Sequence, residues 1–292
     1  RDIWPTIHYR LADVLRHTQT PPAALTHLVQ GIELIEARRT PLRDEGLRIS
    51  LLGRAQQLYE LAVLLLIDEG RGAEAFATVE RARARAFLDL LGEDMPDGLG
   101  GMPETPPATA AAVQASLSAG MAIVEFFATG TPGSYRDVVM NLPPQAQGLR
   151  ELLLPPERLF AFVVTRTELH VVELAASLAG IEREHFNRSD GRLRGITALP
   201  GQPLRPMKRW RDLGARLLLP LQRYARGVRH LTFVPYGPLH YLPLHALAAL
   251  QDLTGIRNTT VGYAPSASIL IRQTIHTERQ RPPSTLLAIG VN

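Results

Sequence analysis

Apolar residues recur with the period of an α-helix through the first 92 residues of the chain. Side chains three, four and seven positions apart share one face of a helix, and four apolar residues near the start follow this rule: Ile7, Leu11, Val14 and Leu15. Pro21-Pro22 interrupts the pattern and is tolerated in the first turn of a new helix. The pattern therefore predicts a first helix that ends before Pro21.

Three further helices are predicted in the same region, at 22–39, 46–69 and 73–91. Gly70 and Gly72 separate the last two, as glycines that close a helix do. Helices joined by short turns form pairs that stack into solenoids, and the commonest use of such stacks is to bind a protein. Residues 1–92 are therefore predicted to form helical repeat pairs.

Residues 93–107 are rich in glycine, proline and acidic side chains, a composition typical of a linker. We therefore place a domain boundary here, and residues 108–292 form the second predicted domain.

The second domain alternates apolar, β-branched runs with helical stretches. The runs predict strands at 122–127, 159–165, 170–174, 231–235, 260–263 and 285–289. A short turn, Arg166-Thr167, joins the second and third strands as a hairpin. Helices are predicted at 178–186, 206–224 and 244–250, and another begins at Ser266, which is a good N-cap. This alternation indicates a mostly parallel sheet with helices on both faces.

A proline-rich insertion, Gly130 to Glu157, separates the first two strands. It predicts an extended surface loop with a short helix near Leu149–Leu153. A partner contact, a lid and an insertion without function all remain open for it.

Composition excludes several kinds of site. The chain has no cysteine, which rules out disulfides, thiolate metal sites and a cysteine nucleophile within these 292 residues. No apolar run is long enough for a membrane span, and no signal peptide is visible, so a cytoplasmic protein without membrane contact is predicted.

The net charge of +4 is uneven. Residues 1–100 hold 12 basic and 15 acidic residues of the total of 32 and 28, so the positive excess lies in the second domain. A nucleic-acid face is one interpretation, but no aromatic or glycine-rich nucleic-acid motif accompanies the charge. Solvated helix surface is the favoured interpretation.

The segment Leu231–Leu250 reads LTFVPYGPLHYLPLHALAAL and resembles the motif of the CHAT domain: a buried strand, a Pro-x-Gly-x-Leu turn, then Leu-Pro and an Ala-Leu helix. Three other segments resemble the family in the same order. These are Ala75–Leu91, Tyr263–Leu270 and Leu286–Gly290. The helices before them resemble tetratricopeptide-type repeats, so the chain as a whole resembles a bacterial protein with tetratricopeptide-type repeats and a CHAT domain.

This resemblance implies the fold class α plus α/β: helical repeat pairs followed by a partial, caspase-like α/β/α domain. CHAT domains are grouped with caspases and separase, and peptidase members use a histidine and a cysteine that follow later strands. We expect this chain to end before those strands, and none of its nine histidines occupies the family's position, so no catalytic residue is assigned. Pro235 and Gly237 turn the chain off the carboxyl edge of the sheet, which makes Tyr236 and His240 candidates for a cleft rim.

Two functions are compatible with the resemblance. The chain is either the sensor and first half of a partner-activated, defence-related cysteine endopeptidase, or a non-catalytic CHAT scaffold. The expected partners are a protein substrate and a protein activator bound by the helices, with a second chain completing the sheet as a further possibility. Any link of this protein to nucleic acid is expected to be indirect.

Other constellations favour structural roles. His230, His240 and His245 lack the spacing of a metal site on one helix, and Ser266 and Ser268 lack the surroundings of a nucleophile, so capping is favoured for both serines. No phosphate-binding glycine motif is present, so neither a metal nor a cofactor is predicted.

Three arginines alternate along the last repeat helix: Arg81, Arg83 and Arg85. Residues two apart do not share a helix face. We expect these side chains to be solvated or to reach toward the CHAT domain.

Overall fold

The computed structural model describes residues 3–18, 20–37, 45–91, 107–131, 143, 145, 155–186, 207–256 and 258–271, with the side chains of 45–54, 84–91 and 207 left out. The predicted linker, apart from residue 107, the predicted helix near Leu149–Leu153 and the predicted strand at 285–289 lie outside the described residues.

Four helices form the N-terminal part, as the hydrophobic period predicts: α1 (Trp4–His17), α2 (Pro21–Glu36), α3 (Glu45–Asp68) and α4 (Gly72–Leu91). Gly31 of α2 lies where three helices meet. A Cβ atom at this position would approach Leu58 Cδ2 of α3 to 2.9 Å and His8 Cβ of α1 to 3.1 Å. The absence of a side chain therefore allows α1, α2 and α3 to pack closely. Their tetratricopeptide character stays a prediction.

The predicted apolar stripe of α1 is divided in the structure, since Leu15 packs against the core and Ile7 is half-buried. Leu11 and Val14 are exposed, whereas the buried positions of α1 are Pro5, Tyr9 and Ala12 on another side of the helix. The period therefore identified the helix correctly but predicted only part of the face that packs.

The second part is built on a sheet of five described strands in the order β3-β2-β1-β4-β5. Their bounds are Met121–Thr129, Arg158–Thr165, Leu169–Leu174, His230–Val234 and Thr260–Tyr263 for β1 to β5. β1, β2 and β3 pair antiparallel, and β2 and β3 form the predicted hairpin, while β1, β4 and β5 run parallel. Among the described residues the sheet is therefore mixed, with two parallel and two antiparallel pairings, rather than mostly parallel as expected.

Helices and short 3-10 turns follow the strands as expected from the alternation, except for α5, which precedes β1 and was not predicted. They are α5 (Ala110–Ser116), α8 (Leu178–His185), α9 (Met207–Leu217), η4 (Leu219–Leu221), α10 (Gln222–Ala225), η5 (Gly237–Tyr241) and α11 (Leu244–Leu250). The single helix predicted at 206–224 is wrong, because α9 ends before Pro220 and a 3-10 turn follows. Proline lacks the N–H that a continuous helix requires.

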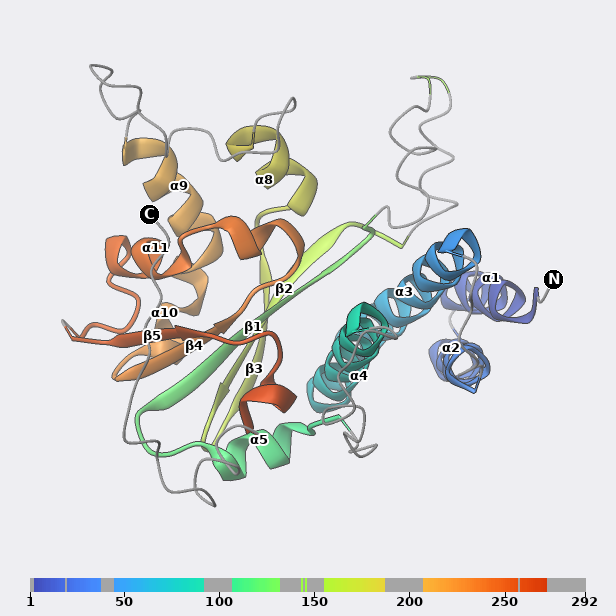
Figure 1. The fold of residues 1–292 in the computed structure, drawn as a ribbon, viewed down its shortest axis with the longest axis horizontal. Helices are drawn as coiled ribbons and strands as arrows, with labels where there is room; N and C mark the ends of the chain where they lie inside the picture. The colour runs from blue at the N-terminus through green and yellow to red at the C-terminus, as the bar shows by residue number, and fades with distance from the viewer. Residues whose placement is uncertain are drawn as a thin grey trace.

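The elements form three layers, with α3 and α4 on one face of the sheet and α9, α10 and α11 on the other (Figure 1). The α plus α/β fold class is therefore confirmed. Alternation along β1 separates the two faces, since Ile123 and Phe127 join the core under α3 and α4, while Val124 and Phe126 join the opposite core.

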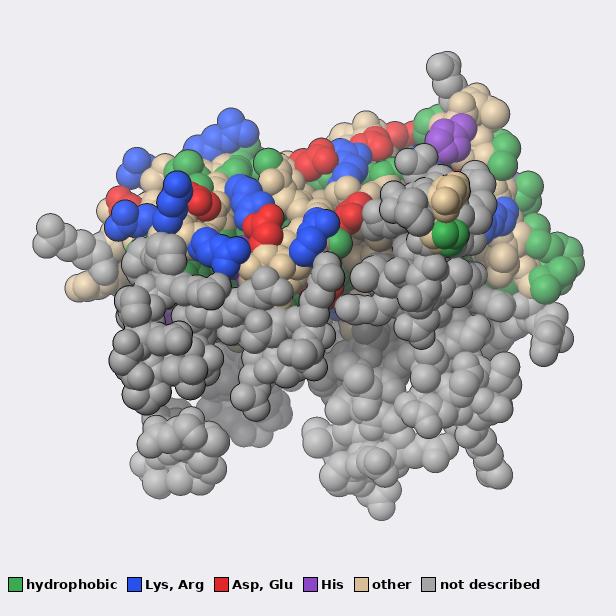
Figure 2. Space-filling view, turned by 90° about the horizontal axis from the view of Figure 1, so that it is seen from above, with side chains coloured by type: hydrophobic (Ala, Val, Ile, Leu, Met, Phe, Trp, Pro, Cys, Tyr) green, Lys and Arg blue, Asp and Glu red, His purple; other side chains and the backbone are tan. Residues whose placement is uncertain are grey.

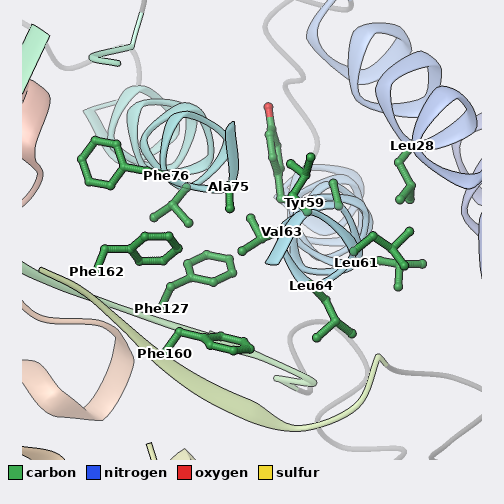
Figure 3. Close-up of a cluster of buried hydrophobic side chains, with 14 of the residues drawn as sticks. Leu28, Tyr59, Leu61, Val63, Leu64, Ala75, Phe76, Phe127, Phe160 and Phe162 are labelled. Carbon is green, nitrogen blue, oxygen red and sulfur yellow. The ribbon is translucent and has the colours of Figure 1, made fainter. Parts of the chain in front are cut away.

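One hydrophobic core connects the N-terminal helices to the sheet. Phe76 of α4 meets Phe162 of β2 edge to face, with ring centroids 5.9 Å apart, and Phe127 and Phe160 lie beside them (Figure 3). The same cluster extends through Leu61 of α3 to Leu28 of α2. The two predicted domains therefore share buried surface.

Among the described residues, no helix combines the length and the apolar character needed to cross a membrane.

Phe76→Ala tests the shared core. The side chain is fully buried, so its loss should lower the free energy of unfolding by about 3–5 kcal/mol. Val14→Ala, at an exposed position, should change it by less than about 0.5 kcal/mol. Urea titration followed by far-ultraviolet circular dichroism measures both. A loss below 1 kcal/mol for Phe76→Ala, on the order of a surface substitution, would contradict the shared core.

Candidate functional site

The chain turns sharply where β4 ends. Gly237 has a φ of +52°, in the left-handed region that favours glycine, and begins the 3-10 turn η5. A Cβ atom at Gly237 would meet only Leu178 Cδ1, at 3.5 Å, so the backbone angle rather than lack of space explains the glycine. The turn places Tyr236 and His240 beyond the carboxyl end of β4.

Arg83 of α4 fills the same end of the sheet. Its guanidinium donates to the carbonyl oxygens of Phe126 at 2.5 Å, Pro235 at 3.0 Å and Pro265 at 3.4 Å. The parallel pairing ends at Glu125 with Val234 and at Phe233 with Tyr263, so the three carbonyls lie at or just past the last paired positions of β1, β4 and β5. One side chain therefore bonds to the backbone of three neighbouring strands where their parallel pairing ends, although β1 itself continues to Thr129 beside β2.

Two buried carboxyl groups lie beside this guanidinium. Glu125 of β1 and Glu80 of α4 are both fully buried, and Arg83 Nε lies 2.6 Å from Glu125 Oε1, close but not aligned as a hydrogen bond. Burial, followed by the Glu80 carboxylate, raises the pKa of Glu125 well above its ordinary value, and the charge of Arg83 opposes this only in part. The Arg83 guanidinium therefore offsets part of the cost of burying the two carboxyl groups.

Glu80 also binds the start of the last described helix, residues 267–271. Its carboxylate accepts hydrogen bonds from the backbone N–H groups of Ala267 at 3.1 Å and Ser268 at 2.6 Å, and from the Ser268 hydroxyl. Ser268 Oγ in turn accepts from the N–H of Ala108 at 2.8 Å. α4, the segment before α5 and the helix after β5 therefore meet at one polar cluster.

The two serines have different roles. Ser266 caps this helix as predicted, since its Oγ accepts from Ile269 N at 3.1 Å. The capping role expected for Ser268 is wrong, because its hydroxyl is directed to the Glu80 carboxylate instead.

A second polar cluster surrounds Glu60 of α3. This buried carboxylate accepts from Gln56 Nε2 at 2.9 Å and from the Thr131 N–H at 3.2 Å, and the Thr131 hydroxyl also contacts it. Gln56 Nε2 lies 3.4 Å from the Tyr236 hydroxyl. Burial raises the pKa of Glu60 to about 7, although these hydrogen bonds oppose the shift. α3 is therefore linked to the end of β1 and to the turn after β4.

The structure places Tyr236 against Arg83, whereas His240 is exposed on η5 and is related to Arg83 only through the charge of the guanidinium. The Arg83 guanidinium lies 5.6 Å from the centre of the Tyr236 ring, which packs on Phe127 at 5.1 Å. Desolvation raises the pKa of Tyr236, whereas desolvation and the charge of Arg83 lower the pKa of His240. That these two residues line the rim of a cleft stays a prediction.

The remaining histidines of the motif region do not join this site. His245 is exposed, and its backbone N–H and its Nδ1 both lie within 3.0 Å of the Tyr263 hydroxyl. His230 lies exposed at the opposite end of β4. Within the described ranges no three His, Cys, Asp or Glu side chains form a group that could hold a metal ion.

The arginines of α4 divide between two partners. Arg81 pairs with Glu36 of α2, with Nε 2.8 Å from Oε1, while Arg83 reaches the sheet as one of the two expectations proposed. The side chain of Arg85 is outside the described residues. Two positions along the helix therefore separate a contact among the N-terminal helices from a contact with the sheet.

Sequence reasoning missed Glu60, Glu80 and Glu125. A usable signal was present for Glu60 and Glu125, because each interrupts an otherwise apolar stretch, and a charged residue is rarely fully buried unless it is paired. Glu80 gives no such signal, since alternating arginines follow it. Glu125 stands in the middle of the strand run AIVEFF. The clusters fix positions of backbone and do not present a nucleophile, since the Ser268 hydroxyl is buried and directed inward.

Residues 208–292 match the family model described as the CHAT domain. The match includes β4, the turn at Gly237, α11 and β5, and CHAT domains are caspase-like, so it supports a protease-related or scaffold role. Neither a curated protein nor a solved structure matches the chain.

Arg83→Ala should lower the free energy of unfolding by about 3–5 kcal/mol, because it leaves a buried carboxyl cluster without its cation. Arg81→Ala is the matched control on the same helix. It removes a more exposed pair and should cost about 1 kcal/mol or less. Arg83→Lys should not restore stability, since an ammonium group cannot span the same donors. Equal losses for Arg81→Ala and Arg83→Ala in urea titration would contradict the role of the strand-end contacts.

Glu60 should make stability depend on pH. Its folded pKa of about 7 exceeds the ordinary value of 4.5, so the folded protein holds the proton more tightly. Its contribution is complete below about pH 4.5 and is lost as pH rises through about 7. Between pH 5 and pH 8 the wild type should lose about 2–3 kcal/mol more than Glu60→Gln. Asp212→Asn, at an exposed acid of α9, should behave as the wild type. Identical pH profiles for the wild type and Glu60→Gln would refute this assignment.

Proposed function

We propose that this chain is the regulatory helical layer and the first part of the protease fold of a caspase-like CHAT cysteine endopeptidase. The observation that carries the proposal is the contact of Arg83 with three carbonyls where the parallel pairing of β1, β4 and β5 ends, at the carboxyl edge of β4 and β5. Two of the three, those of Pro235 and Pro265, lie in the segment that matches the CHAT domain. Sites in α/β sheets are built at that edge.

The helical layer is suited to regulation because its polar side chains determine where the strand ends lie. Arg83 and Glu80 of α4 bind the segments after β4 and β5, and Glu60 of α3 binds the segment after β1. A partner that shifts α3 or α4 would therefore shift the backbone on which a caspase-like site is built. Tetratricopeptide-type repeats would supply the binding surface for such a protein activator.

The catalytic histidine and cysteine are proposed to come from residues that complete the domain, on the same polypeptide or on a second chain. The cysteine thiolate would attack the peptide carbonyl of a protein substrate, and the histidine would transfer the proton to the leaving amine. A defence-related, cytoplasmic role is part of the same proposal.

The second candidate is a non-catalytic CHAT scaffold. The observation that favours it is the absence of cysteine from all 292 residues, including the whole matched segment. In that case the strand-end contacts would only stabilise an assembly surface.

Cleavage by the completed protein separates the two candidates. Incubation with a proteome extract, followed by mass spectrometry of new peptide N-termini, should reveal products that disappear when the completing cysteine is changed to alanine. Because this chain has no cysteine, labelling by a thiol-directed inhibitor reports only on the completing residues.

Regulation through the strand ends has its own expected result. Arg83→Ala should reduce cleavage at least tenfold at a temperature where the variant stays folded, while Arg81→Ala should retain it. Unchanged new N-termini after the cysteine substitution would sink the endopeptidase proposal, and equal cleavage by both arginine variants would sink the regulatory part.

A further inference from the structure

α1 carries an apolar stripe on the surface. Ile3, Trp4, Leu11 and Val14 are 60%, 58%, 43% and 61% exposed, although each is a large apolar residue. At 100° per residue, Trp4, Ile7, Leu11 and Val14 fall within a stripe about 80° wide. Hydrophobic side chains gather at this end of the molecule, where α1 lies (Figure 2). A stripe of this width is the pattern of a helix that packs on another helix.

The side of α1 that packs within the chain is a different one. Tyr9 and Ala12 are buried, and Arg16 pairs with Asp13 at 2.8 Å beside them. α1 thus packs one side against the rest of the protein and exposes a second, apolar side to solvent. This second face is not required for the contacts that α1 makes in the fold.

The size of the stripe fits one helix better than a second copy of the chain. Four large side chains that are about half exposed present on the order of 400 Å² of apolar surface. A stable dimer commonly buries ~800 Å² on each partner. A single amphipathic helix laid along α1 needs less, and its anchors at i, i+3, i+4 and i+7 match the spacing of Trp4, Ile7 and Leu11.

One edge of the stripe is basic, since Arg10 and His17 border it on the side of Val14. His8 lies on the side of Trp4, where burial and His27 of α2 lower its pKa. The single acidic residue of α1, Asp13, lies on another side of the helix. A partner helix would therefore gain from carboxylates beside its own apolar stripe.

We propose that the exposed stripe of α1 binds an amphipathic helix of a partner protein whose apolar side is bordered by acidic residues. The inference deepens the proposed function, on which it rests only for the idea that the helices bind a protein. It does not depend on whether the CHAT region cleaves peptide bonds.

Two synthetic helices of about 18 residues test the proposal. Both carry the same leucine stripe, bordered by glutamate in one and by lysine in the other. The protein is the 292-residue chain with Trp210→Phe, which leaves Trp4 as its one tryptophan. Anisotropy of the fluorescein-labelled peptides gives affinity, and the emission maximum of Trp4 reports whether the stripe is covered.

The glutamate peptide should bind at least tenfold more tightly than the lysine peptide and should shift Trp4 emission to shorter wavelength. Leu11→Glu and Val14→Glu should each weaken binding at least tenfold. The matched control is Leu219→Glu, which makes the same change at another exposed leucine, 48% exposed on η4, and should bind as the parent does. Added salt should weaken the binding of the glutamate peptide but not that of the lysine peptide.

Equal binding of the two peptides, or full binding by Leu11→Glu, would overturn the proposal. A blue shift that grows with protein concentration in the absence of peptide would assign the stripe to a second copy instead. A blue shift with anionic lipid vesicles but with neither peptide would assign it to a membrane surface. If neither peptide binds the chain while the completed protein still shows cysteine-dependent cleavage, this site is rejected and the proposed function stands.

Discussion

The guanidinium of Arg83 occupies the space that parallel strands leave where their pairing ends. Beyond Glu125 and Val234 the backbone carbonyls of β1 and β4 no longer face each other's N–H groups, and buried carbonyls need another donor. A planar group with five N–H donors can serve several carbonyls from one position, which an ammonium group cannot. Much of the arrangement at this end of the sheet follows from this requirement, because the arginine brings α4 with it.

The same guanidinium explains how two buried carboxyl groups are tolerated. Isolated charges in a core are costly, and two carboxylates close together cannot both be ionised without a large penalty. Burial and the neighbouring Glu80 carboxylate raise the pKa of Glu125, Glu80 receives three donors from the start of the next helix, and Arg83 supplies a positive charge. These contacts together offset part of the cost of burying the cluster. Its bonds are directional, so they fix how α4 lies on the sheet more narrowly than the phenylalanine contacts beside it.

Periodicity predicted the elements of this fold well and their mutual contacts poorly. The strand run at 122–127 becomes β1 at Met121–Thr129, and the predicted hairpin forms, because both signals are local. The share of antiparallel pairing was underestimated because register and neighbour choice depend on residues far apart in sequence. Arg81 and Arg83 illustrate the limit for the site. They are two positions apart in similar surroundings, yet one bonds Glu36 and the other bonds carbonyls more than 40 residues later. The prediction that Leu11 and Val14 of α1 pack in the core failed for a related reason, since periodicity defines a face of a helix without saying what covers it.

The helical layer, α1 to α4, makes polar contacts with the sheet through α4 and exposes the apolar stripe of α1. A connected set of side chains lies between these two regions. Gly31 brings α1, α2 and α3 together, and Glu36 of α2 accepts from the Tyr59 hydroxyl of α3 and from Arg81 of α4. Arg83 follows one half-turn along α4 and reaches the strand ends. Contiguity by itself creates no coupling, because a bound helix shifts the strand ends only as far as it binds one arrangement of the layer more tightly than another. The bonds at the sheet are well suited to such a difference. A small rotation of α4 would weaken the three carbonyl contacts together, whereas apolar contacts on the α1 side would change gradually.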